Sequence, residues 1–196
     1  MSIPILSDAD FIISDVKVTH STPNFVTSSI NGKVNAKSRG LHSLEVQAKV
    51  TLVNSDDIKK FQALMLRIRG RLNPFMLSLQ DQTDGKGFCN PLFTPVSPML
   101  ANDISIGQTK MVLSGFSGVI PAGSVFTFAN DTKTHVILND TKSNQEAEFF
   151  PAVRSINANK TKLNFSPIPL VRLDGDSFEV SYDNAKEITL KMKEVM

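Results

Sequence analysis

Alternating apolar and polar positions mark the clearest element of this chain, residues 44–52. The segment LEVQAKVTL places an apolar side chain at every second position, with polar side chains between them. A period of two is typical of a β-strand with one buried face. Residues 11–19 and 25–38 alternate in a similar way, and Asn31-Gly32 favours a hairpin turn within the second of these segments. The first part of the chain is therefore predicted to be rich in strands.

The period then changes to that of a helix. The apolar stripe consists of Ile58, Phe61, Met65 and Ile68. Asn54 or Ser55 is the expected N-cap, acidic residues fill the first turn, and Gly70 is the expected C-cap. We expect one helix near residues 55–69, followed by an alternating strand that begins at Phe75.

Residues 83–98 are rich in glycine and proline and follow neither period, which suits an irregular linker. Beyond them no helical stripe appears. Short strands are expected instead, at intervals of about ten residues, the spacing of a small sandwich or barrel. They are residues 110–115, 124–129, 134–139, 146–153, 161–166, 177–182 and 187–192.

The predicted fold is mainly β and has two domains. Residues 1–82 are expected to form a β-sandwich-like domain that includes the helix. Residues 99–196 are expected to form a small β-barrel of the OB type. A further hypothesis is that the last strand, residues 186–193, leaves the second domain and pairs with the first.

Composition and charge narrow the function classes. With 41% hydrophobic and 20% charged residues, the 196-residue chain is expected to fold rather than to be disordered. Its net charge is only +2, so no global field would hold a nucleic acid, and we expect no specific nucleic-acid partner. We find no apolar run long enough for a membrane span and no secretory signal pattern, and expect synthesis in a cytoplasm.

The search for catalytic chemistry finds no complete motif. SGFSGV lacks the second glycine of a nucleophile elbow, and Cys89 has no nearby histidine. His20, His42 and His135 lack metal-ligand spacing and are expected on the surface or on edge strands. We therefore expect no enzyme activity, no catalytic residue, no metal and no cofactor.

One corner of the sequence does stand out, FQALMLRIRGRLNPFMLSLQD. Arg67, Arg69 and Arg71 surround the predicted end of the helix, with no acidic residue among them. Guanidinium groups suit bidentate carboxylate pairs at an interface, and positive charge also favours a helix C-terminus by itself. Anion or nucleic-acid binding is a third reading. The candidate interface residues are Arg67, Arg69, Arg71, Asn73 and Phe75.

The order of these elements resembles the distal tail proteins, or distal-tail-like minor tail proteins, of long-tailed bacteriophages. The matching residues near the corner are Phe61, Leu64, Arg69, Gly70, Arg71, Asn73, Pro74 and Phe75. Residues 115–138 are similar to a turn-and-strand segment of that family, although Ser124 replaces the commoner aspartate. FFPAVR is similar to its P-P-L-R element at Pro151 and Arg154, and departs from it at Phe150 and Ala152.

The resemblance implies a structural component of the virion tail tip. Such proteins form a ring, commonly a hexamer, with a trimer as the alternative copy number. The implied partners are further copies of the chain, the tail tube protein, and the tail hub and fibre proteins, with a host receptor as a further candidate through the second domain. An alternative reading is that the β-barrel is a carbohydrate-binding, receptor-binding module.

Overall fold

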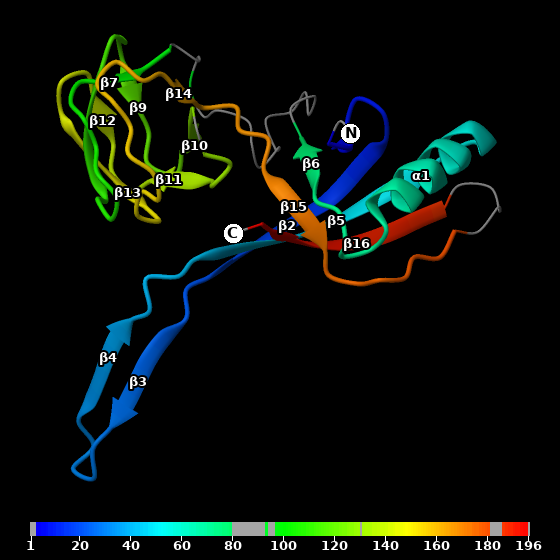
Figure 1. The fold of residues 1–196 in the computed structure, drawn as a ribbon, viewed down its shortest axis with the longest axis horizontal. Helices are drawn as coiled ribbons and strands as arrows, with labels where there is room; N and C mark the ends of the chain where they lie inside the picture. Colours follow the sequence, from blue (N-terminus) through cyan, green and yellow to red (C-terminus); the bar gives the residue numbers. More distant parts are fainter. Residues whose placement is uncertain (1–2, 80–92, 94–96, 130, 181–185, 196) are drawn as a thin grey trace.

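The computed structural model describes residues 3–79, 93, 97–129, 131–180 and 186–195. The fold is mainly β, with one α-helix among the described residues, and it contains a half-barrel sheet and a nearly closed barrel. Each sheet encloses its own hydrophobic core. Figure 1 shows the barrel on one side, the first sheet with its helix on the other, and a long hairpin that projects away from both.

The first sheet has six strands and takes them from both ends of the chain. Their order is β1 (Ile5–Ser7), β6 (Phe75–Ser78), β15 (Leu170–Leu173), β16 (Lys186–Glu194), β5 (Ser43–Leu52) and β2 (Ile12–Ser21). The last strand, β16, pairs with β5 from Lys186 opposite Leu52 to Lys193 opposite Glu45. The chain therefore returns to its first domain before it ends.

The alternation of β5 determines which face of this sheet is buried. All five apolar side chains predicted on one face are almost completely buried: Leu44, Val46, Ala48, Val50 and Leu52. Glu45, Gln47 and Lys49 lie on the opposite face, and none of them is buried. The strand prediction for residues 44–52 is confirmed.

The helix α1 (Ser55–Ile68) covers the apolar face of the sheet. Its buried residues are Ile58, Phe61, Met65 and Ile68, the predicted stripe. The Asn54 side chain caps the helix by accepting a hydrogen bond of 2.9 Å from the Asp57 backbone amide. At the other end the left-handed C-cap is Arg69, with φ of 56°, and not Gly70 as predicted. Gly70 follows it, also with positive φ.

The second sheet curls into the barrel. Its strand order is β14 (Leu163–Asn164), β10 (Val125–Phe128), β11 (His135–Ile137), β13 (Glu146–Phe150), β8 (Lys110–Ser114) and β7 (Met99–Leu100). A bridge between Met99 and Lys162 brings the two ends of the sheet together. Two small strand pairs complete the structure: β9 (Val119–Ile120) with β12 (Thr141–Lys142), and β3 (Asn24–Ser28) with β4 (Val34–Ser38).

Three sequence predictions need correction. The first domain is a single half-barrel sheet covered by a helix, where a sandwich would have a second sheet. The barrel core ends at Phe165, so the predicted domain of residues 99–196 is too long at its C-terminal side. Of the strand predicted at residues 177–182, residues 177–180 are not a strand, and residues 181–182 lie outside the described residues, as does most of the predicted linker at residues 83–98. β15 was not among the predicted strands; Pro167 and Pro169 lie just before it and interrupt the alternating pattern.

Candidate assembly surfaces

The arginine corner forms the turn between α1 and β6. Arg69 donates its backbone amide to the Met65 carbonyl at 2.9 Å, which closes the last helical turn. The Asn73 side-chain amide donates to the Arg67 carbonyl at 3.0 Å and so satisfies another carbonyl at the helix end. Asn73 is thus used inside the corner as a cap.

Arg71 ties this corner to the loop that follows β15. Its backbone amide donates to Asp176 Oδ1 at 3.2 Å, and its Nε donates to the Asp174 carbonyl at 2.9 Å. The approach is close: a Cβ atom on Gly70 would lie only 2.7 Å from the Asp176 Cα atom. The two segments are about a hundred residues apart in sequence, and only a glycine at position 70 allows them to meet so closely.

Arg172 completes the corner from the other side. Its Nη1 atom donates to the carbonyls of Arg71 and Leu72, at 2.9 and 2.7 Å. Sequence reasoning missed Arg172, because a single arginine in a short strand gives no local signal. The corner is therefore held together within one chain by two arginines that donate to backbone carbonyls.

The five candidate interface residues consequently divide into three groups. Phe75 is completely buried in the first core, so it lies on no surface of the chain. Arg71 and Asn73 make the hydrogen bonds just described. Arg67 and Arg69 are exposed, and so is Arg71 in spite of its hydrogen bonds.

A second surface is more extensive, the hairpin formed by β3 and β4. We call residues 22–41 the arm. Figure 1 shows it extending away from both sheets. All ten residues of its two strands are exposed. The predicted Asn31-Gly32 turn is present, with Gly32 at a φ of 80°, but the pattern gave no sign that the hairpin would stand alone.

The strand register gives the arm two different faces. Directly paired residues share a face, and Val26 pairs with Ala36 while Ser28 pairs with Val34. This face therefore carries three small apolar side chains, Val26, Val34 and Ala36, beside polar ones, and Val26 and Val34 are 63% and 62% exposed. On the other face Phe25 pairs with Lys37.

The second face of the arm is cationic. The Arg39 guanidinium carbon lies 5.0 Å from the centre of the Phe25 ring, a cation–π distance. With Lys33 and Lys37 the arm carries three basic residues and no acidic one. The exposed valines thus lie on one face of the hairpin, and Phe25, Lys37 and Arg39 gather on the other.

Two histidines lie at the root of the arm. His20 lies in β2 just before the arm and His42 directly follows it, and their Nδ1 and Nε2 atoms are 3.0 Å apart. Burial, with the Lys133 ammonium nearby, lowers the pKa of His42 to about 4. Burial also lowers the pKa of His135 to about 4. His42 and His135 are buried, so the prediction of surface or edge positions is wrong for these two.

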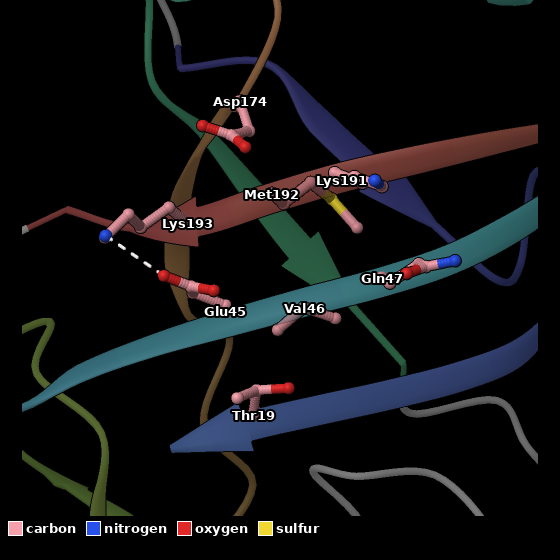
Figure 2. Close-up of a pocket in the computed structure, with 8 residues that line it drawn as sticks. All are labelled: Thr19, Glu45, Val46, Gln47, Asp174, Lys191, Met192 and Lys193. Carbon is pink, nitrogen blue, oxygen red and sulfur yellow. Dashed lines mark hydrogen bonds and ion pairs between the residues drawn. The ribbon is translucent and has the colours of Figure 1, made fainter. Parts of the chain in front are cut away.

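The uncovered face of the first sheet carries a shallow hollow of about 260 Å³. Figure 2 shows its lining: Thr19 from β2, residues 45–47 from β5, residues 191–193 from β16, and Asp174. Lys193 Nζ lies 3.1 Å from Glu45 Oε1, so these charges neutralise each other across the two strands. Neither histidine nor cysteine lines the hollow. It is a polar sheet surface.

The described residues show few other chemical features. Among them, no group of three metal-ligating side chains gathers at one place, and no helix is long and apolar enough to cross a membrane. Cys89 lies outside the described residues. In the barrel, Phe126, Phe128 and Phe149 are buried in the core and present no platform for stacking on sugars or bases.

The residues of the family resemblance in the second half have structural roles in the barrel. Ser124 is buried and its hydroxyl donates to the Pro121 carbonyl at 2.6 Å. Arg154 pairs with Asp131, and the Pro151 carbonyl contacts His135 Nδ1 at 2.8 Å. No protein-family model matches the chain, and no curated protein matches it in sequence.

Proposed function

We propose that this chain is a structural protein that associates with copies of itself through the arm and forms a ring. We further propose that the ring belongs to the tail tip of a long-tailed phage, where it joins the tail tube to the hub and fibre proteins. The exposure of the valines on one face of the arm is the observation that carries self-association. The tail-tip location comes from the resemblance of the sequence.

The arm has the low intrinsic stability of a lone hairpin. A two-stranded hairpin in water is marginally stable at best, and the arm packs none of its ten strand residues against either core. Each of its valines would gain about 1.5–3 kcal/mol from full burial. A partner that covers the face with Val26, Val34 and Ala36 would therefore stabilise both the arm and the complex.

A second copy of the chain offers acidic partners for the arm. The arm has three of the 21 basic residues and none of the 19 acidic ones, so all 19 carboxylates lie on the rest of the chain. The basic side chains of the arm can pair at short range with carboxylates on the body of another copy. Because the arm would bind a different surface of its neighbour, the contact is head-to-tail, and a head-to-tail contact that closes gives a ring.

Variants of the arm test this mechanism. Val26→Thr with Val34→Thr keeps the branched shape and the strand propensity but replaces apolar methyl groups with hydroxyls. We expect this double variant to stay folded and to lose self-association. Thr27→Val, on the opposite face of the same strand, is the matched control and should associate as the native chain does. Native assembly size in the double variant would show that the arm is not the contact.

The location in the virion needs a separate test. Gold-labelled antibodies against the chain, applied to tailed phage particles whose genome encodes it, should mark the tail end farthest from the head. Label spread along the tail, or found on the head, would contradict the tail-tip proposal but would leave ring formation untouched.

A further inference from the structure

The junction between the barrel and the first sheet contains a buried ion pair that also reaches the arm. Lys133, from the loop before β11, pairs with Glu194 at the end of β16. The two residues are only 2% and 3% exposed. Glu194 Oε1 also accepts a hydrogen bond of 2.9 Å from the Thr134 backbone amide. One carboxylate of the first sheet thus holds two consecutive barrel residues.

Lys133 makes a second bond that links the barrel to the arm. Its ammonium donates to the His42 carbonyl at 3.1 Å, in a buried position. His42 directly follows the arm, and its ring contacts His20, which lies in β2 just before the arm. The ring of Phe150, in the barrel strand β13, packs edge-on against His42 with ring centres 5.3 Å apart. Both ends of the arm are therefore anchored at the place where the barrel contacts the first sheet.

A buried ion pair is a costly way to join two domains, because both ions lose their hydration. Such a pair contributes little net stability compared with apolar side chains, but separating either charge from its partner is strongly destabilising, which disfavours other arrangements of these segments. Here the fixed geometry includes three parts of the molecule: the barrel, the end of β16 and the root of the arm.

We propose that the Lys133–Glu194 pair is a lock that sets the direction of the arm relative to the barrel. Opening the lock frees the arm root and the barrel together. This part of the inference rests on the ring proposed above. In that ring, a neighbouring copy bound to the arm would change the position of a partner bound to the barrel, because both contacts act through His42. The reverse effect would follow in the same way.

The experiment removes the lock without leaving a buried charge. In the full chain, Lys133→Met with Glu194→Gln deletes the bond to the His42 carbonyl while the glutamine still accepts from Thr134. Lys110→Met with Glu146→Gln removes an exposed barrel ion pair and is the matched control. Hydrogen–deuterium exchange is measured by mass spectrometry at the arm root, residues 18–22 and 41–44, and in the β5–β16 ladder.

We expect exchange at the root to become at least tenfold faster in the first variant, with the ladder still protected and with no change in the control. Unchanged exchange at the root would overturn the proposal. If the first variant also loses protection in the ladder, Glu194→Gln alone decides: faster root exchange with a protected ladder supports the lock, and unchanged root exchange refutes it.

Measuring self-association of these variants tests this inference separately from the proposed function. With the arm sequence intact, the first variant should associate more weakly than the control. Native-like association together with faster root exchange would limit the lock to positioning within one chain and would overturn its coupling to the neighbour. A native chain that never associates would remove the ring proposal, whereas the exchange result would still test the lock.

Discussion

Arg172 Nη1 donates a hydrogen bond of 2.9 Å to the backbone carbonyl of Arg71, which lies 101 residues earlier in the sequence. The strand that contains Arg172 belongs to the same sheet as the strand that follows Arg71, so the contact closes the first domain from both ends of the chain. The sequence left three readings of the arginine corner open: an interface, a solvated helix end, and anion or nucleic-acid binding. In the structure, Arg71 and Arg172 use the corner for hydrogen bonds within the chain.

Replacing Arg172 by methionine should therefore destabilise the first domain. Two hydrogen bonds from a charged donor are lost at an exposed site, and we expect the free energy of unfolding to fall by about 1–2 kcal/mol. Urea denaturation followed by circular dichroism measures it. Arg69→Met, in an exposed side chain of the same corner, should change stability by less than about 0.5 kcal/mol. Equal effects of the two variants would contradict this role of Arg172.

Gly70 should tolerate no side chain. Alanine would place its Cβ atom 2.7 Å from the Asp176 Cα atom and would adopt a φ of 62°. We expect Gly70→Ala to cost about 2–4 kcal/mol. Gly40→Ala is the control, because Gly40 has a similar φ of 68° and nothing within 4 Å of its Cβ position. Its cost should be only the left-handed strain, about 1 kcal/mol. Equal melting temperatures for the two variants would show that the close approach is absent.

Stability should fall in mild acid because of the two buried histidines. The pKa values of His42 and His135 are about 4 in the folded chain and near 6.5 when unfolded. Below pH 6.5 the unfolded chain binds protons that the folded chain does not bind until about pH 4. The stabilisation is thus complete above pH 6.5 and is lost as the pH falls towards 4.

The window from pH 6.5 to 5 is diagnostic, since ordinary carboxylates stay ionised there. Urea midpoints should decrease steadily through this window in the native chain. His42→Gln should flatten the slope, because glutamine takes up no proton. A native urea midpoint that stays constant between pH 7 and 5 would contradict the assignment of both histidines as neutral and buried.

Two lysines with carboxylate partners should differ strongly in their contribution to stability. Lys133→Met leaves Glu194 buried without its ion partner, and we expect a cost of about 3–5 kcal/mol. Lys110 pairs with Glu146 and Glu148 at 2.8 and 3.0 Å, but at an exposed site. Lys110→Met should cost less than about 1 kcal/mol, because water screens these pairs. Thermal melting of both variants under identical conditions compares them, and equal losses would be the contradicting result.

The spacing of apolar residues correctly predicted the helix and the strand in which one face is buried along the whole element. The stripe of Phe61 and Met65 identified the helix, and the alternation from Leu44 to Leu52 identified the central strand, because each pattern has one dominant period. β15 was hidden because Pro169 lies directly before it, and residues 177–180 alternate without pairing. Whether a segment pairs as a strand depends on whether another strand leaves an edge free beside it. The sequence of the segment alone does not contain that information.

The candidate site was predictable only in part, for a similar reason. The arginines around Gly70 were visible as a cluster in sequence, but their partner Arg172 lies in a distant strand. Lys133 and Glu194 meet only because the barrel docks at the end of β16, and no spacing in the sequence indicates it. The hairpin turn of the arm was predicted from Asn31-Gly32, whereas its exposure depends on where the rest of the chain packs.

The central claim is that this chain forms a ring, and its mass in solution tests that claim most directly. Light scattering across a hundredfold range of protein concentration, followed by negative-stain imaging of the largest species, should show one closed assembly. We expect a mass six times that of the chain, or three times in the alternative, and round particles with a central opening. A mass equal to one chain at every concentration, with no ring in the images, would contradict the account.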